Sequence, residues 1–142
     1  MPLVLLLFFG ITAAAQTSSK VEYLGGTITE FPGGVGGALR VDDPRHLIFS
    51  TRKTSIGVPY DRVNLLEYGQ HVSRRLVLAY LLGPWVLPSK KLKHYLTVGF
   101  ESDEGEQQAM VFRVDKSHVR VVLASLEART GVKVDYLDEQ PK

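Results

Sequence analysis

Apolar and polar residues alternate in short segments along most of this chain, and this alternation limits its possible folds more than any other feature. The clearest pair of segments is 95–100 and 109–114, separated by an acidic turn at 101–106. Alternation places apolar side chains on one face of a strand, so the pattern predicts antiparallel β-structure. After Ser117 the apolar residues recur every three or four positions. That change predicts one amphipathic helix at about 117–130.

Other strand segments precede this hairpin. Residues 21–27 are predicted to be a first strand, and residues 38–50 a hairpin around an Asp-Asp-Pro-Arg turn. Between them, residues 31–37 contain four glycines and a proline, which predicts a flexible connection. Pro59 has no backbone N–H to donate, so residues 56–60 are predicted to be an edge strand or a bulge.

The next segment, 63–68, also alternates. It predicts Val63 and Leu65 on one face of the sheet and Leu66 and Tyr68 on the other. We expect a single domain over residues 16–131, with an apolar insertion at 74–93 and a tail at 132–142 that adds at most a short extended piece. The chain contains no cysteine, so such a domain would be held together without disulfides.

The order of these elements resembles the pleckstrin-homology-like (PH-like) superfamily, including its GRAM-like and small secreted bacterial members. The local sequence is similar too: a hairpin at 38–50, then Ile-Gly-Val-Pro-Tyr-Asp-Arg-Val at 56–63, then Leu-Leu-Glu-Tyr-Gly at 65–69. The resemblance implies a mainly β fold, with a curled antiparallel sheet or partly open barrel of about seven strands capped by a C-terminal helix. The family's phosphate-binding loop does not carry over, because residues 29–37 include Glu30 and no basic residue.

The beginning of the chain has the composition of a targeting segment. Residues 2–9 are continuously apolar and are followed by three alanines at 13–15. This pattern is typical of a secretory signal peptide. We therefore expect residues 1–15 to be a signal peptide and the protein to be exported, either to the periplasm or out of the cell. An N-terminal anchor or a buried strand is the alternative, although fourteen such residues reach only about 21 Å as a helix.

An uncharged stretch of thirteen residues, 76–88, interrupts the strand pattern, and no Asp or Glu occurs from 68 to 100. Leaving its large apolar side chains in water would forfeit roughly 1.5–3 kcal/mol each. These side chains must therefore be covered by something. Basic residues flank the stretch on both sides. The residues predicted to contact a membrane or a partner are Arg74, Arg75, Leu78, Tyr80, Leu81, Leu82, Trp85, Val86, Leu87, Lys90, Lys91 and Lys93.

Three interpretations of this insertion stay open. It is too short to span a bilayer, because thirteen residues reach about 20 Å and the Gly-Pro pair at 83–84 would break a helix. Two short limbs could instead enter one leaflet, with Tyr80 and Trp85 at the interface and the basic residues on headgroups. The segment could also bind a protein partner or a second copy of the chain. Finally, it could pack into the domain's own core.

We predict no catalytic residues, no metal site and no cofactor. The histidines at 46, 71, 94 and 118 are far apart in sequence, and no pair has the i, i+4 spacing of a helical metal site. No Gly-x-Ser-x-Gly elbow occurs. The net charge of +2 is too small to indicate a nucleic-acid partner. The sequence thus predicts a non-enzymatic binding or scaffold module associated with a membrane surface or a protein partner.

Overall fold

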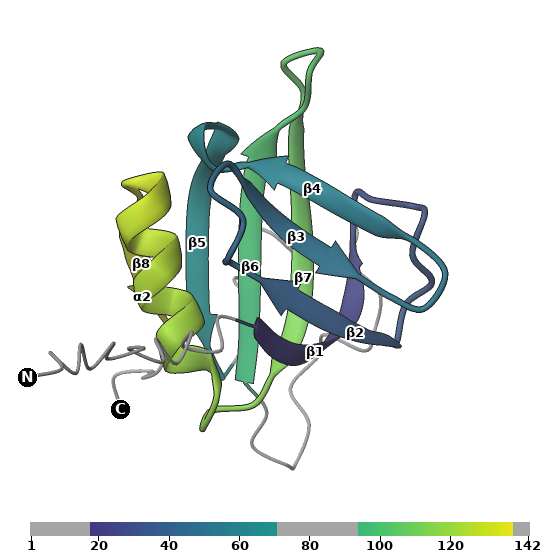
Figure 1. Cartoon of the computed structure of the whole chain (residues 1–142), viewed down its shortest axis with the longest axis horizontal. Helices are drawn as coiled ribbons and strands as arrows, with labels where there is room; N and C mark the ends of the chain where they lie inside the picture. The colour runs from purple at the N-terminus through teal and green to yellow at the C-terminus, as the bar shows by residue number, and fades with distance from the viewer. Residues whose placement is uncertain (1–17, 71–93, 138–142) are drawn as a thin grey trace, which may run out of the picture.

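A computed structural model of the chain describes residues 18–70 and 94–137 (Figure 1). Within these residues it contains eight strands, one short 3-10 helix and one α-helix. In chain order the elements are β1 (Ser18–Gly26), β2 (Val35–Arg40), β3 (His46–Ser50), β4 (Ser55–Pro59), η1 (Tyr60–Arg62), β5 (Val63–Gly69), β6 (His94–Glu101), β7 (Gln107–Val114), α2 (Val119–Thr130) and β8 (Val134–Tyr136).

All eight strands form one sheet, in the order β4-β3-β2-β1-β7-β6-β5-β8. Strands β4 and β8 end this order without closing the sheet, and α2 lies beside β5 and β8 (Figure 1). The predicted fold class, mainly β with a partly open sheet capped by a C-terminal helix, is confirmed. The eighth strand comes from the predicted tail: β8 pairs parallel to β5, with Val134 opposite Leu66 and Tyr136 opposite Tyr68.

One hydrophobic core lies inside the curl of the sheet, where β3 faces β7, and α2 packs against it; we define the inner face of the sheet as the face that bears this core. Its centre is aromatic: the ring of Phe49 lies 4.9 Å from Phe31, 5.0 Å from Phe112 and 6.0 Å from Tyr23. Aromatic pairs at these distances add to the free energy gained from burial alone. The helix contributes Val119, Val122, Leu123 and Leu126 to this core.

The connection between β1 and β2 is shorter than the predicted segment 31–37. Phe31 is buried in the core, and β2 already begins at Val35. Gly34 has φ of +87° and donates its N–H to the carbonyl of Tyr23 at 2.7 Å. The bounds of the predicted connection were wrong, because residues 35–37 belong to β2 and the large side chain of Phe31 gains free energy by burial in the core.

A β-bulge in β5 changes which side chains face the core. The register with β6 shifts between Val63 and Leu65. Val63, Leu66 and Tyr68 consequently all belong to the core, whereas Leu65 does not. Leu65 lies against Gly99, where an added Cβ would approach the Cβ of Leu65 to 2.8 Å. We predicted that the side chains of Val63 and Leu65 would share one face of the sheet. This was wrong, because the bulge inserts one residue into the strand and so shifts the alternation of faces.

The predicted hairpin at 38–50 and the predicted edge strand are both present. β2 and β3 pair antiparallel, and the side chain of Asp43 accepts the backbone N–H of Arg45 and of His46 at 2.8 Å each. β4, which contains Pro59, lies at one edge of the sheet. The hydroxyl of Tyr60 donates to the carbonyl of Asp43 at 2.8 Å and so links η1 to this turn.

The helix begins and ends close to the predicted positions. Asp115 accepts the N–H of Ser117 on its side chain at 2.9 Å and the N–H of Val119 on its carbonyl at 3.1 Å. Gly131, with φ of +73°, ends the helix and donates its N–H to the carbonyl of Glu127 at 3.0 Å. Glycine is favoured there because a left-handed residue carries no steric penalty without a Cβ.

The buried hydroxyl of Tyr23 makes the stability of the core depend on pH. This hydroxyl donates a hydrogen bond to the carbonyl of Ile28 at 2.8 Å. Burial disfavours the phenolate and raises the pKa of Tyr23 from 10.0 to about 12. The folded state therefore holds this proton more tightly than the unfolded state. Its contribution to stability is complete below pH 10 and is lost as the pH rises through 12.

We expect the free energy of unfolding to fall above pH 10, with a slope from this group approaching about 1.4 kcal/mol per pH unit. Urea denaturation at stepped pH measures this slope. Tyr23→Phe should lose about 1 kcal/mol at neutral pH, because the Ile28 carbonyl loses its donor, and should show a shallower slope in alkali. Equal slopes in the two proteins would contradict the assignment to Tyr23.

Candidate functional site

All the residues predicted to contact a membrane or a partner lie in 74–93, outside the described residues. The structure does describe the two places where this segment joins the fold. β5 ends at Gly69, β6 begins at His94, and Gly69 pairs with Tyr95. The insertion therefore connects neighbouring positions at one end of the β5–β6 hairpin. We call this end, made of Gly69, Gln70, His94 and Tyr95, the insertion root.

A groove of about 570 Å³ lies at the insertion root, between α2 on one side and β5 and β8 on the other. Its floor contains the buried side chains of Tyr68, Val119 and Leu123. The rings of Tyr68 and His94 stack with centroids 5.8 Å apart, and the hydroxyl of Tyr68 lies 3.2 Å from Nδ1 of His94. Tyr136 meets Tyr68 edge-on at 6.0 Å. We call this site the α2–β8 groove.

Two cationic side chains line the α2–β8 groove. Lys116 comes from the turn before α2 and Arg120 from its first turn. Neither takes part in any ion pair between described residues. The carboxylate in the groove is that of Glu127, which accepts the N–H of Val134 at 3.1 Å. The groove therefore carries more positive than negative charge.

The sequence prediction missed these residues. His94 was recognised as one end of the insertion, but Lys116, Arg120 and Tyr136 lie far beyond residue 93 in the chain. They reach the insertion root because β7 runs back beside β6 and α2 follows it, and because β8 then pairs with β5. Their only sequence signal is charge or aromatic character, which gives no position in space.

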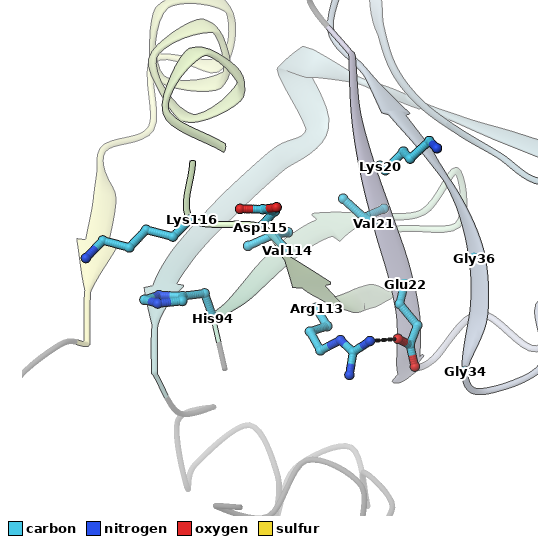
Figure 2. A pocket seen from close by; sticks show the side chains of 10 residues that line it. All are labelled: Lys20, Val21, Glu22, Gly34, Gly36, His94, Arg113, Val114, Asp115 and Lys116. Atoms are coloured by element: carbon cyan, nitrogen blue, oxygen red, sulfur yellow. Dashed lines mark ion pairs between the residues drawn. The ribbon is translucent and has the colours of Figure 1, made fainter. Parts of the chain in front are cut away.

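A second, more open groove of about 710 Å³ lies on the other side of His94 (Figure 2). Arg113 and Glu22 form an ion pair of 2.5 Å in it, and Lys20 lines its far side. Figure 2 shows the side chains of His94 and Lys116 extending away from this ion pair. Lys20, Arg113 and Lys116 line this groove together with Glu22 and Asp115, so its lining also holds one more positive than negative charge.

The outer face of the sheet, opposite to α2, is also buried at its centre. Tyr95 and Thr97 on β6 are 3 % and 2 % exposed, and Ala109 and Val111 on β7 are 1 % and 0 % exposed. None of these side chains belongs to the core under α2. Burial on both faces is typical of strands that are covered on both sides. Among the described residues, the helix that packs against the sheet does so on the inner face.

Within the described part of the chain, no helix combines the length and the apolar composition needed to cross a bilayer. In the same part, no three histidine, cysteine or carboxylate side chains come together in a way that could hold a metal ion. Neither the models of known protein families nor the curated proteins match this chain.

Proposed function

We propose that this protein is a non-enzymatic binding module that associates with an anionic membrane surface through residues 74–93. The observation that carries the proposal is the pairing of Gly69 with Tyr95, which puts both ends of the insertion at one end of the sheet. Both basic flanks of the insertion lie within a few residues of this end along the chain. Lys116 and Arg120 add positive charge at the same end.

Apolar contact supplies most of the binding free energy in this proposal. The large apolar side chains between 76 and 87 are worth roughly 1.5–3 kcal/mol each when they leave water. A basic side chain close to an anionic leaflet adds about 1 kcal/mol at low salt. Binding should therefore weaken only modestly in high salt, because screening affects the smaller contribution.

Replacing Trp85 with aspartate tests the proposal. The wild-type chain should co-sediment with vesicles of phosphatidylglycerol and phosphatidylcholine, and Trp85→Asp should lose most of this binding. A charge in the acyl region costs about 2.5–3.5 kcal/mol, equivalent to a loss of roughly 100-fold. Trp85 is the only tryptophan, so a blue shift of wild-type fluorescence on adding vesicles reports insertion directly.

The matched control is Val121→Asp, which places the same charge on an exposed apolar residue of α2. It should bind vesicles like the wild type. Circular dichroism establishes that both variants are folded. Vesicle binding that survives Trp85→Asp unchanged, in a folded protein, would remove the membrane proposal.

A second candidate function is favoured by the buried outer face. We propose as the alternative that the run 76–88 packs on this face, over Thr97 and Val111, and that the domain is a scaffold. The low exposure of those side chains supports it. In this case Trp85→Asp would bury an unpaired charge and unfold the domain. If the insertion instead binds a partner or a second copy of the chain, the Trp85→Asp variant should stay folded and be monomeric.

We also propose that the chain is a PH-like domain of an exported protein. What supports the first part is the order of elements, seven strands joined as an antiparallel sheet and then a helix that packs on it. What supports export is the apolar run at 2–9 with its small residues at 13–15. Residues 1–15 lie outside the described part of the chain. Cleavage after Ala15 would leave Gln16 as the first residue, and N-terminal sequencing of the exported protein would detect it.

A further inference from the structure

We propose that the α2–β8 groove binds a terminal phosphate group, which Lys116 and Arg120 hold by charge-assisted hydrogen bonds. The inference rests on the proposed function in one respect, because a phospholipid headgroup at the membrane surface is one source of such a group. A soluble phosphomonoester is the other source. Both present the same chemistry to the groove, a doubly charged tetrahedral group with three accessible oxygens.

Unbalanced positive charge is the first argument. Lys116 and Arg120 line one groove, and neither has an ion-pair partner among the described residues. Glu127 lines the same groove and Asp115 precedes Lys116 in the chain, and each accepts hydrogen bonds from the fold. Glu127 accepts the backbone N–H of Val134 at 3.1 Å, and Asp115 accepts both the N–H and the hydroxyl of Ser117, at 2.9 Å and 2.7 Å. These hydrogen bonds to Ser117 hold the pKa of Asp115 below its usual range. With Glu127 counted, the lining still holds one more positive than negative charge, which an anion in the groove would offset.

The form of the groove is the second argument. Its volume of about 570 Å³ is within the usual range for small-molecule sites, roughly 300–1,000 Å³. Its floor of Tyr68, Val119 and Leu123 is buried, whereas the side chains of Lys116 and Arg120 are exposed at its rim, where a ligand from solution can reach them. The aromatic rings of His94 and Tyr136 form walls on which the organic part of a ligand could stack.

Phosphate fits these groups better than a carboxylate does. Arginine binds phosphate oxygens in pairs through its planar fork, while lysine acts as a point charge. Two different cations on one groove can therefore contact different oxygens of a tetrahedral group. A carboxylate offers only two oxygens in one plane. A phosphodiester, in which two oxygens carry organic substituents, reaches less easily into a groove.

Titration of the full chain with inorganic phosphate tests the groove without any membrane. Amide NMR signals of Lys116, Arg120 and His94 should shift in a saturable manner. The double variant Lys116→Glu/Arg120→Glu should lose the response. Its matched control is Arg52→Glu/Lys53→Glu, which changes the net charge equally in the exposed turn between β3 and β4 and should respond like the wild type. Absence of groove shifts in the wild type, or equal responses in the two double variants, would overturn the proposal.

Vesicles distinguish the two sources of phosphate. Vesicles of phosphatidic acid carry a terminal phosphate, and vesicles of phosphatidylserine with matched surface charge do not. If the source is a lipid, the wild type should bind phosphatidic acid about tenfold more tightly, and the groove variant should lose this preference. If the source is soluble, phosphate should still shift the groove signals and no lipid preference should appear. Trp85→Asp should keep the phosphate response in either case, so the failure of membrane binding and the failure of the groove give different results.

Discussion

Replacing Phe49 with alanine is expected to lower the free energy of unfolding by about 3–5 kcal/mol, which would leave a domain of this size barely folded. Phe49 is 1 % exposed, and its ring contacts the rings of Tyr23, Phe31 and Phe112. Removing it leaves a cavity between these three rings. The loss therefore includes the transfer free energy of the ring and the contacts of its neighbours. Urea denaturation followed by circular dichroism measures it.

Val121→Ala is the control for this loss. Val121 is 51 % exposed on α2, so its truncation should change the free energy of unfolding by less than about 0.5 kcal/mol. A loss below about 1 kcal/mol for Phe49→Ala would show that the aromatic cluster is not the centre of the core. The same denaturation curves provide the reference for every variant discussed above.

Replacing Gly37 with alanine should cost about 3 kcal/mol, a large effect for one added methyl group. A Cβ at Gly37 would lie 2.4 Å from the carbonyl oxygen of Ser50 and 2.7 Å from the ring of Phe49. The first contact is with backbone of β3, and the second is with a ring already held on all sides. β2 and β3 would have to separate at this point, and the hydrogen bonds between them would lengthen.

The neighbouring residue offers a matched comparison. A Cβ at Gly36 would meet nothing within 4 Å. Gly36→Ala should therefore be neutral or stabilise the protein by up to about 1 kcal/mol, because alanine has less backbone entropy to lose on folding. Thermal denaturation of the two single variants gives the comparison. Similar midpoints for Gly36→Ala and Gly37→Ala would contradict the close approach of β2 to β3.

Periodicity was sufficient to predict most of the elements. The alternation at 95–100 and 109–114 corresponds to β6 and β7, and the change after Ser117 corresponds to α2. Each of these two patterns extends over many residues and predicts that one face of the strand or helix is buried. In the structure, one face of each of these elements does lie in the core. Gly131 ends the helix where the sequence placed its end, because the left-handed conformation strongly favours glycine.

Features that depend on one residue or on distant contacts could not be predicted from periodicity. The bulge at Val63 and Leu65 is invisible in a pattern that reads as continuous alternation. Phe31 lies among glycines, yet it is buried because Tyr23 and Phe49 come to it from distant parts of the chain. β8 depends on the free edge of β5, which only the assembled sheet provides.

One part of the candidate site could be predicted from the sequence and the other could not. The insertion was recognised from composition, since an uncharged run between basic flanks is a local property. The α2–β8 groove was not, because it joins β5, β8 and α2 through contacts between Tyr68, His94 and Tyr136. Sequence pattern predicts what must be buried, and topology decides which polar residues meet at the surface.

The open sheet has a further consequence for how copies of this protein could meet. Its terminal strands offer little to an incoming chain: β4 has five residues and includes Pro59, and β8 has three. A proline cannot donate to a new ladder, and a three-residue strand provides too few hydrogen bonds to template one. Growth into a continuous intermolecular sheet is thus disfavoured at both ends. A dimer formed by the described residues is therefore expected to rest on side-chain contacts more than on backbone pairing.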